Sequence, residues 1–317
     1  MGRRLAQSRG GQGGHCGVLD VGVDAGSPTC EDVRMSSHWT QDPGPLLHVG
    51  EGFRLGDVDP ESTPGYEGEK KSGQRDLAAA APNLDDLQER LFAAHHDKDS
   101  GPAVLLVLQA MDTAGKGGIV RHVVGSVDPQ GVELAAFKKP TEEELAHDFL
   151  WRIRKRVPRP GMIGVFDRSH YEDVLIGKVR SLADPAEIER RYDAINAFEA
   201  ELAEAGVVII KVMLHISPEE QRDRLLERLD RPDKHWKYNP GDVDERLLWP
   251  AYMEAYQDVF ERTSTAIAPW YVVPANRKWY ARLAVQRLLI DALSAIDPQW
   301  PPADYDIEVE KKRLLAS

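Results

Sequence analysis

The sequence is poor in cysteine and lacks a long apolar run. Its two cysteines, Cys16 and Cys30, both lie in a glycine-rich N-terminal stretch, so the sequence indicates neither a disulfide framework nor a cysteine metal cluster. We therefore expect a reducing, cytoplasmic setting. The longest apolar run, 207–214, is interrupted by Lys211 and is far shorter than the roughly 20 residues that a membrane-spanning helix needs. No apolar segment follows the basic N-terminus, so we expect neither a secretory signal nor a membrane partner.

Positive charge is also scarce, with 40 Lys and Arg against 52 Asp and Glu and a formal net charge of −12. This balance argues against a protein that coats nucleic acid, so no nucleic-acid partner is expected. Residues 101–180 differ from the rest, because they hold 12 Lys and Arg and only 10 Asp and Glu. A basic centre inside an acidic chain favours a buried site for an anionic substrate.

A glycine-rich loop with a lysine follows the apolar run 102–110. The run predicts a buried strand, and the loop Met111–Gly118 predicts a phosphate site, where backbone N–H groups and a helix N-terminus face an anion. The P-loop pattern is incomplete, because Gly117 stands where a Ser or Thr would contact Mg²⁺, and Asp112 is the candidate that replaces it. The alternative is an ordinary strand-to-helix turn with a solvated Lys116. The order of strand, loop and helix favours phosphate binding.

A second apolar run, 162–167, ends in an acid that is followed by a polar cluster. In an open α/β sheet, ligands bind at the carboxyl ends of the strands, so we expect Asp167 to lie near the glycine-rich loop. An acid in that place holds Mg²⁺ in P-loop enzymes. Alternatively, Asp167 caps the next turn and Arg168 is its partner. The loop upstream favours the functional interpretation.

A third segment concentrates positive charge on a helix and the loop after it. Ser217 and Glu220 have the spacing of a capping box, which predicts a helix start. The stretch 231–237 is too polar for a core, and we interpret it as a mobile lid that brings cations onto phosphates and excludes water. The alternative is a solvated basic helix with an ordinary loop. The cations of the segment are Arg222, Arg224, Arg228, Arg231, Lys234 and Lys237, and further candidates elsewhere are Lys139, Arg152, Arg154, Lys155 and Arg156.

Strand-like and helix-like segments alternate after the glycine-rich loop, which predicts an α/β fold with a parallel sheet and helices on both faces. Thr141 is expected to cap a helix that turns Leu145, Phe149, Leu150 and Ile153 inward. Another helix, carrying Leu84, Leu87, Leu91 and Phe92, precedes the first strand. We expect strands at 102–110, 132–138, 162–167, 207–216 and 270–275, and further helices near 185–205, 217–229, 245–265 and 278–295.

The chain divides into four parts by composition. Residues 1–34 show no apolar period, and we treat 1–45 as a disordered leader or an artefact of start-codon choice, with Met35 as a candidate start. An N-terminal arm and helix, packed on the core, are expected at 46–100. The remaining parts are a core at 101–296, with its lid at about 217–245, and a C-terminal tail at 297–317.

Several segments together resemble the polyphosphate kinase 2 family over about residues 46–295. The resemblance implies a P-loop kinase fold, a three-layer α/β/α arrangement with a parallel sheet of about five strands and a lid. It also implies an enzyme that transfers the terminal phosphoryl group of inorganic polyphosphate to a nucleoside mono- or diphosphate, reversibly, with Mg²⁺ or Mn²⁺. We expect a homo-oligomer. The segments are Gln109–Gly118, Phe137–Lys138 with Pro140–Thr141, His147–Arg152, Phe166–Leu175, Lys234–Lys237 and Ala268–Ala275.

The resemblance also implies roles for single residues. Lys116 would bind and polarise the phosphates, while Asp112 and Asp167 hold the metal. Arg168 completes the catalytic set, and no protein nucleophile is needed, because an anionic phosphate oxygen of the acceptor attacks. The residues that bind phosphate or polyphosphate would be Gly115, Gly117, Gly118, Arg121, Lys138, Arg231, Lys234 and Lys237.

The acceptor is less well defined. Glu172 and Asp173 lie in a segment similar to that of relatives that accept both mono- and diphosphates, which makes them the expected acceptor region. That subgroup commonly has Asn in place of Asp167, so the sequence leaves the choice among ADP, AMP, GDP and GMP open. Asn276 stands where relatives usually have Asp, and we expect it to alter a metal or lid contact.

Two alternatives stay open at this point. An ATP-dependent small-molecule kinase would use the same loop and lid. A polyphosphate-binding protein without turnover would keep the cations, although the presence of Asp112, Lys116 and Asp167 together counts against it.

Overall fold

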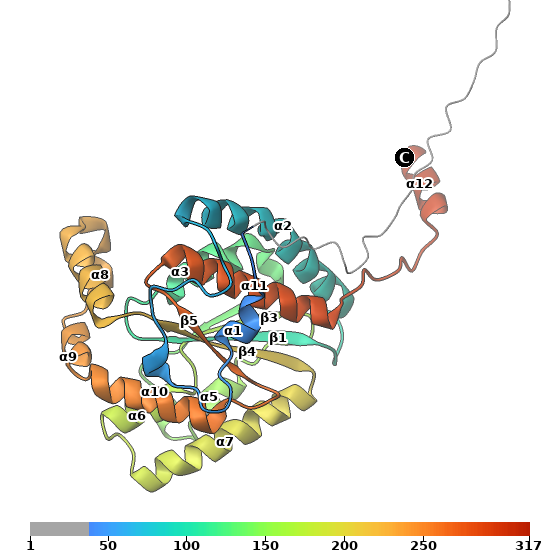
Figure 1. Ribbon diagram of the computed structural model, residues 1–317. Helices are drawn as coiled ribbons and strands as arrows, with labels where there is room; N and C mark the ends of the chain where they lie inside the picture. The colour runs from blue at the N-terminus through green and yellow to red at the C-terminus, as the bar shows by residue number, and fades with distance from the viewer. Residues whose placement is uncertain (1–37) are drawn as a thin grey trace, which may run out of the picture. The chain divides into compact units, whose positions relative to one another are not determined.

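Five parallel strands form the centre of the part of the chain that the computed structural model describes, residues 38–317 (Figure 1). In the sheet they lie in the order β2-β3-β1-β4-β5. The predicted three-layer α/β fold and its five strands are confirmed, with strand ends shifted by at most two residues. The strands are β1 (Ala103–Ala110), β2 (Val132–Ala136), β3 (Ile163–Asp167), β4 (Val207–His215) and β5 (Trp270–Pro274).

The central strand β1 is buried along its whole length, as parallel strands covered on both faces are. Its side chains alternate between two core clusters, with Val104, Leu106 and Leu108 in one and Leu105 and Val107 in the other. The first face is covered by α2 (Lys70–His95), α3 (Lys116–His122) and α11 (Lys278–Ile296), and the second by α6 (Glu172–Val179), α7 (Pro185–Glu204) and α10 (Trp249–Thr263) (Figure 1).

The remaining elements are short or peripheral. None of the helices in residues 38–317 is long and apolar enough to cross a membrane. The remaining elements are α1 (Pro43–Leu47), α4 (Glu142–Leu145), α5 (Trp151–Arg154), α8 (Pro218–Asp230), α9 (Gly241–Leu247) and α12 (Ile307–Leu315), with the 3₁₀ helices η1 (Leu55–Asp57), η2 (Val124–Ser126), η3 (Pro129–Gly131) and η4 (Pro232–Lys237).

The N-terminal arm packs on the core from Trp39 onward. The Trp39 ring is buried and meets the Tyr66 ring edge-on at 5.1 Å between centroids. The boundary expected between leader and arm, at residues 45 and 46, falls inside α1. The predictions for residues 1–34, for Met35 as a start and for both cysteines lie outside the described residues.

The segment after Thr141 differs from the predicted single helix. The cap is present, because Thr141 and Glu144 form a capping box, but α4 ends after one turn and α5 begins six residues later. Between the two helices, Oδ1 of Asp148 accepts from the backbone N–H of Leu150 at 3.0 Å, a turn that competes with a helix. The prediction for Leu145 was therefore wrong, and its side chain is 67% exposed.

A buried ion pair links β4 to helix α7. The Nζ of Lys211 donates to Oε2 of Glu199 at 2.6 Å, and both side chains are almost fully buried. The remaining donors of Lys211 reach the Tyr171 hydroxyl at 2.9 Å and the Thr263 carbonyl at 2.7 Å. Since every donor of this ammonium group is satisfied, the pair is tolerated inside the core. Through Tyr171, which follows β3, the ion pair also connects the segment after β3 to helix α7.

Replacing Glu199 with Gln is expected to lower the free energy of unfolding by about 3–5 kcal/mol, because the Lys211 charge loses its buried partner. Chemical denaturation followed by circular dichroism measures the change. The matched control is Glu201→Gln on the same helix, whose partner Arg154 and own side chain are about half exposed. That variant should change stability by about 1 kcal/mol or less. Equal effects of the two substitutions would contradict this account of the buried pair.

Candidate functional site

The glycine-rich loop lies between β1 and α3, at the carboxyl edge of the sheet. Two of its residues have positive φ, Thr113 at 69° and Gly115 at 125°, and the second value favours glycine because glycine has no Cβ to clash. Within the described part of the chain, several backbone N–H groups have no protein acceptor, those of Thr113, Gly115, Lys116 and Gly117. Unpaired N–H groups gathered on one loop form a site for an anion.

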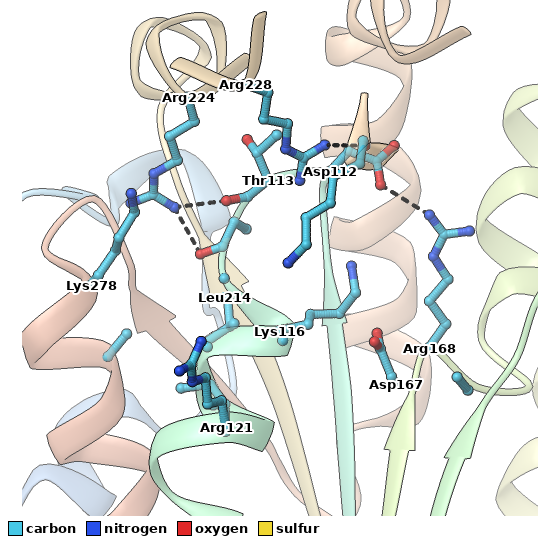
Figure 2. Close-up of a pocket in the computed structure, with 18 of the residues that line it drawn as sticks. Asp112, Thr113, Lys116, Arg121, Asp167, Arg168, Leu214, Arg224, Arg228 and Lys278 are labelled. Atoms are coloured by element: carbon cyan, nitrogen blue, oxygen red, sulfur yellow. Dashed lines mark hydrogen bonds and ion pairs between the residues drawn. The ribbon is translucent and has the colours of Figure 1, made fainter. Parts of the chain in front are cut away.

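The loop borders a cavity of about 630 Å³ that is lined mainly by positive charge (Figure 2). Among the described residues, eleven Lys and Arg line it, against three acids, Asp112, Asp167 and Glu227. Such an excess of cations around one cavity suits a ligand with many negative charges. The cations are Lys116, Arg121, Lys138, Arg168, Arg224, Arg228, Arg231, Lys234, Lys237, Lys278 and Arg282.

Two carboxylates and an arginine line the cavity where β1 and β3 end. Asp167, the last residue of β3, is in register with Leu108 of β1, so it lies beside the start of the loop. Asp112 and Asp167 both line the cavity, as does Lys116, whose Nζ donates to the Ala110 carbonyl at 3.2 Å. The Nη2 of Arg168 donates to Oδ1 of Asp112 at 2.9 Å (Figure 2).

The charge of Arg168 is fixed by its neighbours. Burial opposes the charged form, but the carboxylates of Glu172 and Asp112 raise the pKa of Arg168 above its ordinary value. Its φ of 63° is unusual for a residue with a side chain, and its backbone N–H donates to the carbonyl of Leu108 at 3.0 Å. The bond to β1 holds this strained residue at the cavity wall.

Most of the residues singled out in the sequence line this cavity. They include Gly115, Gly117 and Gly118 of the loop, Arg121 and Lys138 after it, and Arg231, Lys234 and Lys237 of the segment expected as a lid.

The two residues expected at the acceptor lie outside the cavity lining. Asp173 is engaged by two arginines, with 3.5 Å to Nη2 of Arg152 and 3.8 Å to Nη1 of Arg191. Burial raises the pKa of Glu172, whereas the nearby Arg168 and Lys116 act to lower it. Glu172 is therefore coupled to the site by charge, while Asp173 is part of an ion-pair cluster behind it.

The other candidate cations around residue 154 also have contacts away from the cavity. Arg152 donates to the Lys138 carbonyl at 2.8 Å, and Arg154 donates to Glu201 at 2.7 Å. The Lys155 ammonium lies 3.1 Å from the centre of the Trp151 ring. Arg156 donates to the Leu134 carbonyl, and neither Lys139 nor Arg222 lines the cavity.

Asn276 contacts the base of the expected lid rather than the cavity. Its Oδ1 accepts from the backbone N–H of Ser217 at 2.9 Å, and its Nδ2 donates to Oε1 of Glu61 at 3.0 Å. A carboxylate in this place could not donate to Glu61, so the amide fits its two neighbours. Asn276 is outside the cavity lining, and its effect on a metal or lid contact stays a prediction.

Sequence reasoning missed two cations of α11, Lys278 and Arg282. They are four residues apart on the first turns of the helix that follows β5, so they share one face and point toward the carboxyl edge of the sheet. Burial lowers the pKa of Arg282, and Arg121 and Arg224 lower it further. Two cations four residues apart, directly after a predicted strand, are the sequence pattern that could have identified them.

The family model described as "Polyphosphate kinase 2 (PPK2)" matches residues 67–301. The chain belongs to the polyphosphate kinase 2 family.

Two named relatives of this polyphosphate kinase 2 chain are of similar size. The "AMP/ADP-polyphosphate phosphotransferase" of Meiothermus ruber is 46% identical over 78% of this chain and 91% of its own length. The "ADP-polyphosphate phosphotransferase" of Rhodopseudomonas palustris is 39% identical over 80% of this chain and 91% of its own length. The crystal structure of Polyphosphate Kinase 2 from Arthrobacter aurescens TC1 is 59% identical, covers 88% of this chain and 99% of its own, and gives a TM-score of 0.85.

Replacing Arg282 with Gln in this polyphosphate kinase 2 is expected to weaken the binding of inorganic tripolyphosphate about tenfold, because a partly buried cation facing the cavity is lost. Isothermal titration calorimetry measures the dissociation constant. Arg287→Gln, one turn further along α11 and paired with Asp291 outside the cavity, is the control. Equal binding by wild type and Arg282→Gln would rule out a contact between this cation and the anion.

Proposed function

We propose that this polyphosphate kinase 2 transfers the terminal phosphoryl group of inorganic polyphosphate to AMP or ADP. The observation that carries the proposal is the cavity beside the glycine-rich loop, whose wall is lined mainly by cations among the described residues. Polyphosphate bears negative charge on each phosphate unit, so a path lined by cations suits it better than a single charged point does. The names of the relatives from Meiothermus ruber and Rhodopseudomonas palustris support AMP and ADP as acceptors.

In this reaction an oxygen of the acceptor's terminal phosphate attacks the terminal phosphorus of polyphosphate. The bond from that phosphorus to the bridging oxygen breaks, and polyphosphate shortened by one unit leaves with the electron pair. The attacking oxygen is already anionic, so no protein base or nucleophile is required. The protein contributes alignment and charge neutralisation, with Lys116 and Arg168 on the phosphates at the end of the loop.

The residues present fit a magnesium ion, for which Mn²⁺ could substitute. Asp112 and Asp167 would hold it, since both carboxylates line the cavity and Arg168 occupies only one oxygen of Asp112. No group of three or more His, Cys, Asp or Glu within residues 38–317 could enclose a metal. Mg²⁺ commonly takes one or two carboxylates, with phosphate oxygens and water as the other ligands. When bound, the ion neutralises charge on the reacting phosphates.

The expected lid would supply the remaining cations. Arg231 is paired with Glu227 and Asp233, each at 3.0 Å, and Lys234 with Asp233 at 2.9 Å. These two cations lower the pKa of Asp233 to about 2. All of these side chains are about one third to three fifths exposed, so the pairs are weak and can exchange for phosphate oxygens. Closure of this segment would exclude water from the reaction.

The experiment that tests the proposal supplies purified protein with polyphosphate, Mg²⁺ and either AMP or ADP. Chromatography should detect ADP from AMP or ATP from ADP, and parallel reactions with GMP and GDP define the base preference. Phosphorylation of another acceptor by ATP, without polyphosphate-driven synthesis, would favour an ordinary small-molecule kinase. Polyphosphate binding without any transfer would favour a binding protein.

Lys116→Ala links that activity to this site. We expect the turnover to fall on the order of 10² or more, because the ammonium group stabilises charge on the transferred phosphoryl. Lys311→Ala is the control, since Lys311 is exposed on α12 and pairs with Glu308. Full activity of Lys116→Ala would remove this lysine from the mechanism.

Removal of divalent cations with EDTA is expected to abolish transfer, and added Mg²⁺ or Mn²⁺ should restore it. Asp167→Asn should raise the Mg²⁺ concentration needed for half-maximal turnover by about tenfold, because an amide is a weaker ligand for a hard cation. A Mg²⁺ titration of turnover measures this, together with a calorimetric titration of Mg²⁺-dependent ADP binding. A variant with unchanged Mg²⁺ dependence in both would exclude Asp167 as a metal ligand.

A further inference from the structure

Two side chains of helix α8 donate hydrogen bonds to backbone carbonyl groups of the glycine-rich loop. Gln221 and Arg224, three residues apart on one face of α8, are both buried. The Nε2 of Gln221 donates to the Asp112 carbonyl at 3.2 Å. The Nη1 of Arg224 donates to the carbonyls of Thr113 at 3.0 Å and Ala114 at 2.9 Å (Figure 2). Three consecutive carbonyls of the loop are therefore held from one side.

Arg224 uses all five of its N–H donors inside the protein. Besides the two loop carbonyls, its Nη2 donates to the carbonyls of Ala275 at 2.7 Å and Asn276 at 3.0 Å. Its Nε donates to Oε1 of Glu220 at 2.6 Å. A guanidinium has five donors in a fixed fork, and here none is left for a ligand. Arg224 therefore borders the cavity without a free donor for a phosphate. The sequence had placed it among the cations that were expected to bind the substrate.

The amide of Gln221 has a defined orientation. Its Oε1 accepts from Nη1 of Arg246 at 3.2 Å, and an arginine can only donate. The oxygen must therefore face Arg246, which turns the NH₂ group toward the Asp112 carbonyl. The contact to the loop is fixed from behind by a residue of α9.

Holding these carbonyls also orients the N–H groups of the loop. In a trans peptide the C=O and the N–H of one unit point in opposite directions. The carbonyl of Asp112 faces α8, so the N–H of Thr113 points away from α8. In the same way, the carbonyl of Ala114 faces α8 and the N–H of Gly115 points away from it. Both of these N–H groups have no protein acceptor among the described residues.

We propose that Gln221 and Arg224 are positioning residues that set the peptide planes of the loop so that its N–H groups face the bound phosphates. The inference rests on the proposed function, because the ligand of the loop is taken to be a phosphate chain. It assigns the first turns of α8 to the loop rather than to a moving lid. The cations that close on the substrate then begin beyond Arg224.

The first test is Gln221→Glu, which keeps the size of the side chain and its bond to Arg246. It removes the donor to Asp112 and places a carboxylate oxygen against a carbonyl oxygen, so the loop should lose its orientation while the fold is retained. We expect kcat/KM to fall about tenfold or more and tripolyphosphate binding to weaken. Hydrogen exchange of residues 111–118 in the presence of saturating tripolyphosphate should speed up, with the melting temperature close to that of wild type.

Arg224→Lys is the second variant, because lysine keeps the charge and loses the fork, and it should show the same pattern. Arg222→Lys is the matched control, since Arg222 is exposed on the same helix and is paired with its neighbour Asp223. Gln221→Glu alone decides the matter if Arg224→Lys does not fold. Wild-type kinetics, binding and loop exchange in Gln221→Glu would overturn the inference, and so would losses that only follow a lower melting temperature.

The two proposals fail in different ways. If wild type makes no ADP or ATP from polyphosphate, the proposed function fails, and exchange and tripolyphosphate binding still test the loop contacts. If wild type is active and Gln221→Glu matches it in every measurement, the positioning role alone is wrong.

Discussion

A loop that binds phosphate through its backbone has to turn its N–H groups toward the anion while its carbonyl oxygens are satisfied elsewhere. In this chain the carbonyls of residues 112–114 are bound by Gln221 and Arg224 of α8. Arg224 also binds the carbonyls that follow β5, so one buried guanidinium joins the ends of β1 and β5 to the helix after β4. The glycine-rich loop, the segment that leads into α11 and the start of α8 meet at this junction.

The charges around the cavity fall into two groups. Arg282 of the cavity wall has a pKa lowered by burial and by other cations, so it adds to a positive field that suits a polyanion, whereas Arg168 is balanced by the carboxylates of Asp112 and Glu172. Cations on the exposed segment, such as Arg231 and Lys234, are paired with neighbouring acids. The net charge of −12 of the whole chain is compatible with such a site, because the acids lie mostly elsewhere.

Much of the fold could be predicted from the sequence, because strand and helix periodicity is local. The run Ala103–Ala110 is apolar throughout, and its neighbours alternate with helical segments, so a parallel sheet follows. The prediction failed where a side chain competes with the backbone over a few residues. Asp148 forms a turn with Leu150 between α4 and α5, where a single helix was expected after Thr141. Helix propensity does not predict such a turn, because an Asp side chain can either bond to a nearby backbone N–H or face solvent within a helix. The helix start at Ser217 was predicted correctly, because its side chain accepts from the backbone N–H of Glu220 at 3.1 Å.

The sequence by itself determined that a glycine-rich loop with a lysine follows a buried strand, and that two acids lie at strand ends. These are properties of adjacent residues, and the parallel sheet brings such ends to one edge. Only the tertiary structure decided which cations face the cavity. Arg224 and Lys278 belong to different helices, and Asp173 is taken by Arg152 and Arg191. The partner of a charge is set by how helices pack across the sheet, which no spacing along the chain specifies.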